Sequence, residues 1–252
     1  ICPHFEEVNN ICDRAAMLTN GRIWKVISKD MMSREVREVY SYTMEYDRMV
    51  RSHLRKREQK PQKQEELFCW RNYSKTVEKE ISFPIYKGEY LAVQIHGSQI
   101  LQEIAEILYE DFSKDAKVSV IRESPTVSMI FPELDYMDNL CMALSRRMKN
   151  LWRNHKIRHN IRQEYGKILG DEVFEMPVDA LSEKQKYQLV YARVMLQNPQ
   201  IVFCIKPFKG ADLTHRMVVW KLLEAFLEKG ITVVDLSLNL SDSLSVADRL
   251  LL

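Results

Sequence analysis

LSEKQKYQLVYARVMLQNPQIVFCIKPFKGAD, residues 181–212, is the stretch that decides the fold class. It opens on Ser182 with Glu183 and Gln185 directly behind, which is typical of a helix start. A serine side chain caps free amide groups there, and an acidic residue suits the positive end of the helix dipole. Apolar residues then recur at helical spacing up to Asn198-Pro199, where proline ends the helix.

Five consecutive apolar residues, 201–205, follow this predicted helix. A short unbroken apolar run is typical of a strand that is buried on both faces of a parallel sheet. In open α/β sheets, ligands bind just beyond the carboxyl ends of such strands. We therefore expect residues 206–212 to lie where an α/β enzyme has its active site.

The composition is that of an ordinary globular protein. The chain has 252 residues, 46% hydrophobic and 29% charged residues, and a net charge of +2, which favours no special partner. Its five cysteines lack metal-binding or disulfide spacing, no apolar run reaches the roughly 18 residues of a membrane-spanning helix, and no signal peptide is recognisable. We expect a cytoplasmic protein. Because the sequence begins without methionine and ends abruptly on three leucines, we also expect a piece of something longer.

From residue 67 onward, predicted strands and helices alternate. Residues 67–73 and 78–95 alternate apolar and polar side chains around a Lys87-Gly88 turn, which predicts an antiparallel β patch leading into a buried strand. Apolar periodicity then predicts a helix at 100–112, strands at 118–121 and 127–131, a largely helical segment at 138–170, a helix at 213–228, a strand at 231–237 and a last short helix. This order implies a parallel sheet with a helical insertion.

The N-terminal residues echo the C-terminal ones. Asp13-Arg14 and Asp248-Arg249 each follow a short predicted helix and open an apolar strand, which suggests tandem units. Asn20-Gly21 between two apolar runs predicts a β-hairpin. An amphipathic helix is expected over residues 33–49, and residues 51–65 have the charged, apolar-poor composition of a linker.

Four blocks resemble, in order and spacing, the C-terminal nucleotide-binding half of the tandem ATPases of ribose- and galactose-type sugar importers, in the ABC transporter superfamily. The blocks are KGEYLAVQI at 87–95, LSEKQKYQ at 181–188, IKPFKGAD at 205–212 and LSLNLSDSLSVADR at 236–249. They stand where that family has roughly GEILGVSG, the LSGGNQQK signature, the DEPTRGVD strand end and SSEMPEVLGMSDR. EEVNNICDRAAMLTNGRI, residues 6–23, is similar to the end of the preceding half.

The resemblance implies a domain division and partners. Residues 1–50 correspond to the C-terminal remnant of a preceding ABC half, built as helix, hairpin and helix, and residues 51–66 to a charged linker. Residues 67–252 correspond to a degenerate P-loop NTPase-like nucleotide-binding domain with an antiparallel β patch and a helical insertion at about 138–180. The implied partners are another nucleotide-binding half, in the same chain or as a dimer, and a transmembrane permease subunit. The resemblance thereby implies that this chain is cytoplasmic and peripheral at the inner face of the cell membrane.

The resemblance also locates the family's phosphate loop, whose residues differ here. Such a loop needs glycines that let backbone N–H groups surround the phosphates, a lysine that reaches the β- and γ-phosphates, and a hydroxyl for Mg²⁺. Only Gly97 and Ser98 keep the loop's flexibility, and leucine cannot neutralise phosphate charge. The glycine, lysine and hydroxyl places fall, in order, on Ile95, Ser98, Ile100, Leu101 and Gln102.

The positions of the family's Mg²⁺-binding and catalytic carboxylates also lack the residue types that the chemistry needs. The Mg²⁺-holding aspartate corresponds to Ile205 and the catalytic glutamate to Lys206, and a charged ammonium has no lone pair with which to accept a proton from water. Two signature glycines correspond to Glu183 and Lys184, so we assign no catalytic residue. The candidates for nucleotide contact are Ser182, Gln185, Asp212, Gly97 and Ser98.

Three explanations fit this pattern. The resemblance is accidental, or this half is a pseudo-ATPase kept for pairing, docking or regulation, or it still binds nucleotide weakly or completes a composite ATP site in an active tandem ATPase. In the composite site, Ser182 hydrogen-bonds a γ-phosphate held by the other half. Because the phosphate grip, the metal position and the carboxylate are altered together, we favour the pseudo-ATPase. No cofactor is then expected in this fragment, and ATP with Mg²⁺ only in a composite site.

Three other features have simpler interpretations. His155 and His159 lie one helical turn apart, but no carboxylate or cysteine completes a metal site, so we favour a solvated basic helix. Residues 146–162 hold seven Lys or Arg and no acid. With so small a net charge, an exposed face or a contact to an acidic protein is favoured, and no nucleic acid is expected. Asp235, after an apolar pair, is interpreted as a structural hydrogen-bonding residue rather than a nucleophile.

Overall fold

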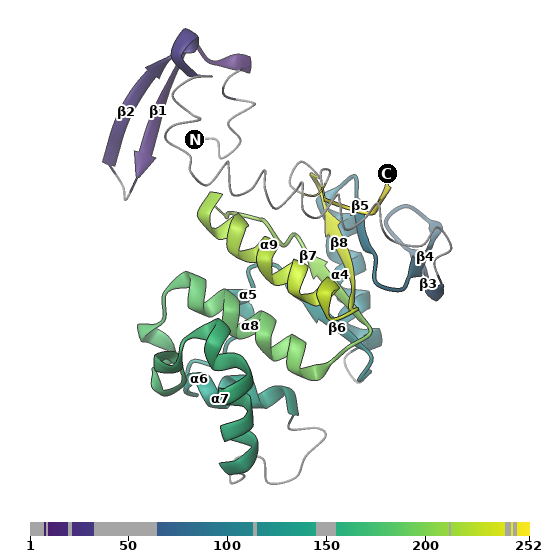
Figure 1. The fold of residues 1–252 in the computed structure, drawn as a ribbon. Helices are drawn as coiled ribbons and strands as arrows, with labels where there is room; N and C mark the ends of the chain where they lie inside the picture. Colours follow the sequence, from purple (N-terminus) through teal and green to yellow (C-terminus); the bar gives the residue numbers. More distant parts are fainter. Residues whose placement is uncertain are drawn as a thin grey trace. The chain divides into compact units, whose positions relative to one another are not determined.

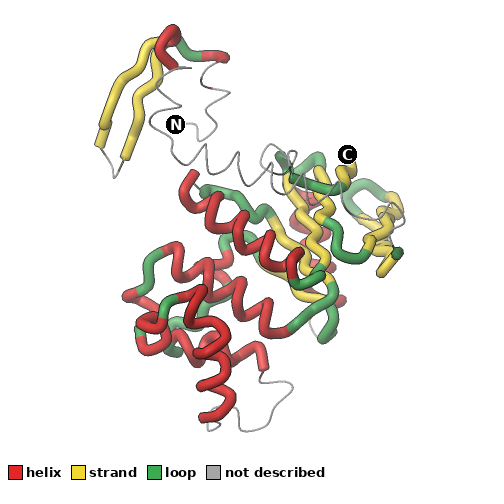
Figure 2. Tube along the Cα trace, in the orientation of Figure 1, coloured by secondary structure: helices red, strands yellow, loops and turns green. Residues whose placement is uncertain are grey.

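The structure is a computed structural model that describes residues 8, 10–19, 22–32, 65–112, 115–144, 155–211, 213–239, 243 and 246–252. The chain divides into two compact units, residues 1–59 with 211–217 and residues 60–210 with 218–252. Figure 2 marks the helices, strands and loops. The helix expected at 33–49 and nearly all of the linker expected at 51–66 lie outside the described residues.

The first unit contains the predicted β-hairpin. Strands β1 (Arg14–Thr19) and β2 (Arg22–Ser28) pair antiparallel, with Thr19 opposite Arg22 across the expected turn. The backbone N–H of Lys29 donates to the carbonyl of Asp13 at 2.9 Å, which closes the open end of the hairpin. The hairpin prediction is therefore confirmed, although the turn residues 20 and 21 themselves are not described.

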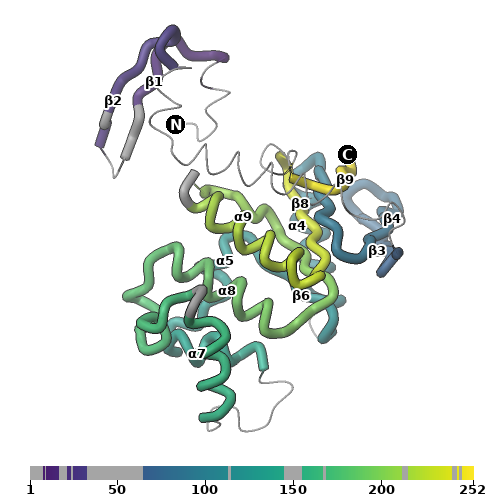
Figure 3. Tube along the Cα trace, in the orientation of Figure 1, coloured from purple at the N-terminus to yellow at the C-terminus, as the bar shows by residue number. Residues whose placement is uncertain are grey.

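A five-stranded parallel sheet forms the centre of the second unit. Its strands are β5 (Tyr90–Gln94), β6 (Val118–Ile121), β7 (Ile201–Ile205), β8 (Thr232–Ser237) and β9 (Arg249–Leu251), in the order β6-β7-β8-β5-β9. Figure 3 shows β8, late in the chain, beside the much earlier β5. Every residue of β7 and β8 is buried, as the unbroken apolar run in β7 predicted.

Helices cover both faces of this sheet (Figure 1). Helix α4 (Ser98–Phe112) places Leu101 and Leu108 in a core shared with β5, β7 and β8. Residues of opposite parity face the other side, where Tyr90 contacts Trp220 of α9 (Leu213–Glu228) with ring centroids 5.5 Å apart. Helix α8 (Glu183–Gln197) packs on α9 through Tyr191. Within the described residues, no helix is long and apolar enough to cross a membrane.

The predicted antiparallel patch packs against α4. Strands β3 (Glu66–Ser74) and β4 (Lys79–Tyr86) pair antiparallel, and Trp70 and Phe83 join the core on α4. Glu103 of α4 accepts hydrogen bonds from the Ser74 hydroxyl at 2.8 Å and from the Lys75 and Thr76 amides at 2.5 and 3.2 Å. One carboxylate thus fixes the turn that follows β3.

The segment between β6 and α8 is largely helical, as predicted (Figure 2). It contains α6 (Tyr136–Cys141), α7 (His155–Leu169) and the 3-10 helices η1 (Met142–Leu144), η3 (Asp171–Glu175) and η4 (Val178–Ala180). Tyr136 of α6 packs edge-on against Phe174 of η3, with ring centroids 5.8 Å apart. Residues 145–154 are outside the described part of this segment.

The strand expected at 127–131 is wrong. Residues Pro125–Ser128 form the short helix α5, because Pro125 at the first helical position favours a helical turn. Phe131 is not part of a strand. Its backbone is held by the buried Asn139, which accepts from the Phe131 N–H at 2.9 Å and donates to the Phe131 carbonyl at 2.8 Å.

The Asp-Arg pair near the C-terminus ties β9 to β5. Asp248 accepts a hydrogen bond from the Tyr90 amide at 2.8 Å, and Arg249, the first residue of β9, donates to both oxygens of the buried Glu89 at 2.8 and 3.1 Å. Strand β1 likewise begins at Arg14, so both expected strand starts are confirmed. The last short helix expected before Asp248 lies partly outside the described residues.

Candidate functional site

The connection between β5 and α4 stands where the resemblance puts the phosphate loop, and it is short. The amide of Ile95 donates to the Ser237 carbonyl of β8 at 2.9 Å, so sheet pairing continues one residue beyond β5. Helix α4 already begins at Ser98. Only Ile95, His96 and Gly97 separate the two elements, and Gly97 makes the turn with a φ of 121°.

The lysine and hydroxyl positions of that loop lie inside α4. Leu101 is 1% exposed and belongs to the hydrophobic core, and its amide donates to the Gly97 carbonyl at 3.2 Å. Gln102 is exposed and donates to Glu106 one turn further along, at 3.1 Å. Leu101 and Gln102, at the positions that would contact phosphate and Mg²⁺, are therefore part of helix α4.

These residues do not fit Mg-ATP. A phosphate cradle needs several backbone N–H groups that point at the ligand and a cation that reaches it. Here the Ile95 and Leu101 amides are hydrogen-bonded within the fold, and the apolar side chains of both residues are buried in the core. Gly97 and Ser98 are exposed at the start of α4, and that pair is what remains of the expected loop.

The carboxyl end of β7 carries a cation. Ile205 is buried in the core, and Lys206 follows with a φ of 46°, a left-handed conformation that a residue with a Cβ rarely adopts. The Lys206 amide donates to the Leu236 carbonyl of β8 at 3.0 Å, which holds the backbone in this conformation. The Lys206 side chain is 19% exposed, so its ammonium is partly withdrawn from water.

Glu123, two residues beyond β6, is the partner of this cation. Its Oε2 lies 2.9 Å from Lys206 Nζ, and its Oε1 forms a second ion pair with Lys209. The hydrogen bond from Lys209 and the charge of Lys206 lower the pKa of the Glu123 carboxyl, against an opposing effect of burial. By the resemblance, a hydrolytic cassette has a carboxylate at this edge of the sheet. Here the edge holds a Lys–Glu–Lys cluster, in which one carboxylate is shared by two ammonium groups.

Ser182 and Gln185 are brought together in a capping box at the start of α8. The Gln185 amide donates to the Ser182 hydroxyl oxygen at 3.3 Å, and the Gln185 side-chain oxygen accepts from both the Ser182 amide and hydroxyl at 2.8 Å. Glu183 forms an ion pair with Lys186 at 3.0 Å. The predicted N-cap is confirmed, and both candidate contact residues take part in capping their own helix.

The remaining sequence candidates separate into described and undescribed residues. Asp212 lies outside the described part of the chain, so its contact role stays a prediction. His155 and His159 are exposed on α7. Within the described residues, no group of three or more His, Cys, Asp or Glu side chains is placed to hold a metal ion.

Two arginines of α7 are paired with acids of the same helical segment. Arg158 forms an ion pair with Asp138 of α6, and Arg162 is 2.9 Å from Glu175 and 3.7 Å from Asp171. Residues 146–154 of the basic stretch lie outside the described residues, so the expected exposed face or acidic protein contact stays a prediction.

Asp235 has the structural surroundings that the sequence suggested. It is fully buried in β8 and accepts hydrogen bonds from the Tyr90 hydroxyl at 3.0 Å, from Ser237 at 2.6 Å and from Ser243. Burial raises the pKa of Tyr90 well above its usual value, so the phenol remains a donor to this carboxylate.

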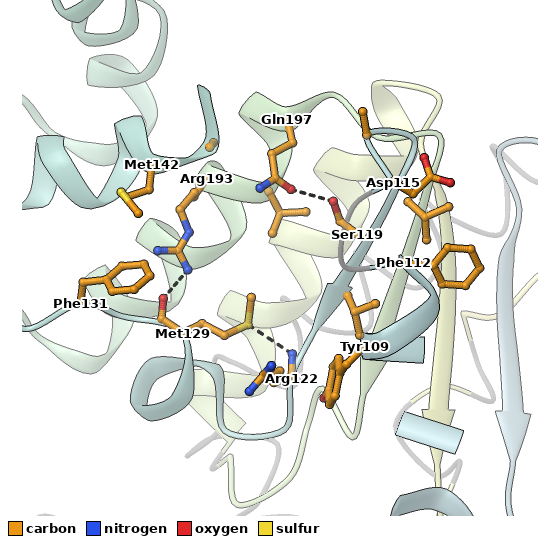
Figure 4. A pocket seen from close by; sticks show the side chains of 15 residues that line it. Tyr109, Phe112, Asp115, Ser119, Arg122, Met129, Phe131, Met142, Arg193 and Gln197 are labelled. Atoms are coloured by element: carbon orange, nitrogen blue, oxygen red, sulfur yellow. Dashed lines mark hydrogen bonds between the residues drawn. The ribbon is translucent and has the colours of Figure 1, made fainter. Parts of the chain in front are cut away.

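Two charged side chains of this region are not singled out by the sequence patterns. Glu123 is detectable in principle, because it follows a strand at the sheet edge where ligands bind. Arg193 lies on the buried face of α8, although it is a charged residue, and it borders the cavity of about 430 Å³ shown in Figure 4. Buried arginine is rare without a partner and is therefore a sequence signal in its own right.

The comparisons with known proteins match the chain to ABC import proteins. No protein-family model matches. The chain is 21% identical to the xylose import ATP-binding protein XylG of Moorella thermoacetica over 97% of this chain and 54% of that protein. It is 25% identical to the spermidine/putrescine import ATP-binding protein PotA of Mycoplasma mycoides subsp. mycoides SC over 68% of this chain and 53% of that protein. The chain thus spans about half the length of these relatives.

Solved ABC cassettes share the fold. The structure of cbiO1 from Clostridium perfringens, part of the ABC transporter complex cbiONQ, matches with a TM-score of 0.56 and 16% identity over 73% of this chain and 83% of that one. A dimeric bacterial ABC transporter cassette matches with a TM-score of 0.51 and 15% identity over 70% of this chain and 88% of that one. The predicted nucleotide-binding-domain fold, with its parallel sheet and antiparallel β patch, is confirmed. The chain therefore has the fold of ABC transporter ATP-binding cassettes and is similar in sequence to ABC import ATP-binding proteins.

Proposed function

We propose that this chain is a pseudo-ATPase half of an ABC import system, with a structural, pairing or regulatory role. The observation that carries the proposal is the burial of Leu101, because the position of the phosphate-binding lysine is a core residue of α4. A nucleotide would have to unwind the first turn of this helix to recreate a loop. The Lys206–Glu123 ion pair supports the same conclusion at the hydrolytic position.

The proposed partners are a second nucleotide-binding half, in the same chain or as a dimer, and a transmembrane permease subunit. The dimeric cassette among the similar structures supports the first partner, and the import proteins among the relatives support the second. Sugar uptake is the proposed transport class, since the import relatives include xylose import ATP-binding proteins and the sequence blocks are of the sugar-importer type. Such an assembly places this chain at the cytoplasmic face of a membrane.

The proposed domain division follows from the same relation. Residues 1–50 represent the end of a preceding half, residues 51–66 a linker, and residues 67–252 the degenerate nucleotide-binding domain with its insertion at about 138–180. The relatives' length, about twice that of the matching part, supports a chain with a further half.

A second candidate function is a composite ATP site. Ser182 is exposed at the first turn of a 15-residue helix, where free amides and the helix dipole favour an anion. In an active tandem protein this terminus would contact the γ-phosphate that the other half binds. The test is ATP turnover of the longer protein after Ser182→Gly, which removes the hydroxyl but keeps a tolerated N-cap. Lowered turnover with unchanged folding supports the composite site, and unchanged turnover rejects it.

A further inference from the structure

Strand β9 shows how an Asp-Arg pair fastens an edge strand to a parallel sheet. Asp248 accepts a hydrogen bond from the Tyr90 amide at 2.8 Å, and its own amide donates to the Tyr90 carbonyl at 2.8 Å. Arg249 then pairs with Glu89, whose carboxylate is fully buried directly before β5. One acid and one cation therefore fix the register of β9 on β5.

Strand β1 begins with the same two residue types but has no such neighbour. Within the described residues it pairs with β2 alone (Figure 1). Asp13 and Arg14 are both exposed, and Arg14 forms no ion pair with another described residue. The Asp13 carbonyl accepts from the Lys29 amide, which is a contact inside the hairpin. Both side chains are therefore available to a strand that lies along the other edge of β1.

The hairpin also has an uncovered apolar face. Val26 of β2 is 56% exposed and lies opposite Ala16 of β1, which is exposed as well, whereas Ile27 is buried. Counted from the Asp-Arg pair, Ala16 matches Leu251, which packs against the core that β5 shares with α4. A two-stranded hairpin is only marginally stable alone, so a third strand and a covering helix would bury what is open here.

We infer that β1 is the edge strand of a parallel sheet in a further nucleotide-binding half of the same polypeptide, held there by Asp13 and Arg14 as β9 is held on β5. The strand that receives β1 is preceded by a buried carboxylate, as β5 is preceded by Glu89. This inference rests on the proposed domain division and names the contact that joins residues 1–50 to the further half. The import proteins to which the chain is similar, about twice as long as the matching part, support such a half.

Hydrogen exchange of the β1 amides, measured by mass spectrometry on the 252-residue chain and on the longer protein, tests the inference. We expect exchange about 100-fold slower or more in the longer protein, because the open edge of β1 is then hydrogen-bonded. Arg14→Met should speed this exchange by about tenfold or more in the longer protein, since it leaves a buried carboxylate without its cation. In the 252-residue chain the same substitution should have no effect.

Arg22→Met, at an exposed arginine at the start of β2, is the matched control and should change exchange in neither protein. The comparison of the two wild-type proteins needs no substitution, so it tests the pairing of β1 even if Arg14→Met prevents the longer protein from folding.

Three results would overturn the inference. Equally fast exchange of β1 in both proteins would also remove the domain division on which the inference rests. Slow exchange in the longer protein that Arg14→Met leaves unchanged would reject the Asp-Arg contact and leave the division standing. Exchange in the 252-residue chain that slows as its concentration rises would assign the edge to a second copy of this chain. ATP is absent from these measurements, so none of the three results bears on the proposed loss of ATP binding.

Discussion

Lys206 and Glu123 form an ion pair, with Nζ and Oε2 2.9 Å apart, across the carboxyl ends of two neighbouring parallel strands. By the sequence resemblance, Lys206 stands where a hydrolytic cassette has the glutamate that polarises water, and here its ammonium is paired with the Glu123 carboxylate. The pair also helps to hold Lys206 in a left-handed backbone conformation that costs about 1 kcal/mol for a non-glycine residue. Lys206 is therefore stabilised by its surroundings, through the ion pair with Glu123.

Glu123→Gln should lower the free energy of unfolding by about 1 kcal/mol, since both ion pairs are only partly buried. The reason is that Lys206 and Lys209 lose their shared counter-charge. Urea denaturation measures the effect. Glu133→Gln, at an exposed glutamate in the loop before α6, is the matched control and should change stability by less than about 0.5 kcal/mol. Equal effects of the two substitutions would show that the cluster does not stabilise the fold.

Leu101→Lys, which restores the residue type of a phosphate loop, should destabilise the chain by about 3 kcal/mol or more and should not create ATP binding. Leu101 is enclosed in the core, so the new ammonium would be buried without a partner. Gln102→Lys, at the exposed neighbouring position, is the control and should leave the unfolding midpoint nearly unchanged. A stable Leu101→Lys protein that binds Mg-ATP would contradict the description of α4 as a closed structural helix.

Arg249→Met should cost about 3 kcal/mol of unfolding free energy, because it leaves the fully buried Glu89 carboxylate without its cation. Glu89→Gln combined with Arg249→Met should cost less than the sum of the two single changes, since the double variant buries no uncompensated charge. Chemical denaturation of the four proteins measures the coupling. Strict additivity would mean that the pair does not join β9 to β5 energetically.

The stability of the chain should fall between about pH 5 and pH 2, partly through Glu103. Hydrogen bonds, first from the Thr76 side chain and also from Ser74 and the Lys75 amide, lower the pKa of Glu103 from 4.5 to about 2. A lowered pKa in the folded state gives stability that is complete above pH 4.5 and is lost as the pH falls toward 2. Glu103→Gln should flatten this part of the pH profile, whereas Asp111→Asn, at an exposed residue of the same helix, should not. Parallel profiles for all three proteins would reject this role of Glu103.

The sequence predicts those helices and strands whose apolar spacing or capping residue follows directly from local structure. The apolar run of β7, the Ser182 cap and the helical spacing of α4 and α9 all depend on local chemistry that a single sequence displays. The error at 127–131 came from short-range apolar content, which does not distinguish a strand from a segment whose backbone is satisfied by a distant side chain. Asn139 makes these hydrogen bonds to the Phe131 backbone, and no pattern within residues 127–131 predicts them.

The sequence alone could name Leu101 and Lys206 as the residues at the family's lysine and glutamate positions, because the four blocks match in order, and their roles stay predictions. The surroundings of these residues could not be predicted. The pairing of Lys206 with Glu123 depends on β6 and β7 being neighbours, and the burial of Arg193 depends on how α8 packs against the segment after α5. Both are properties of tertiary structure that adjacent residues do not encode.

Isothermal titration with Mg-ATP decides whether the 252-residue chain holds nucleotide by itself, with the xylose import ATP-binding protein XylG of Moorella thermoacetica as the positive control. For a pseudo-ATPase half we expect no saturable heat at millimolar Mg-ATP. Saturable binding with a micromolar dissociation constant would contradict the proposal.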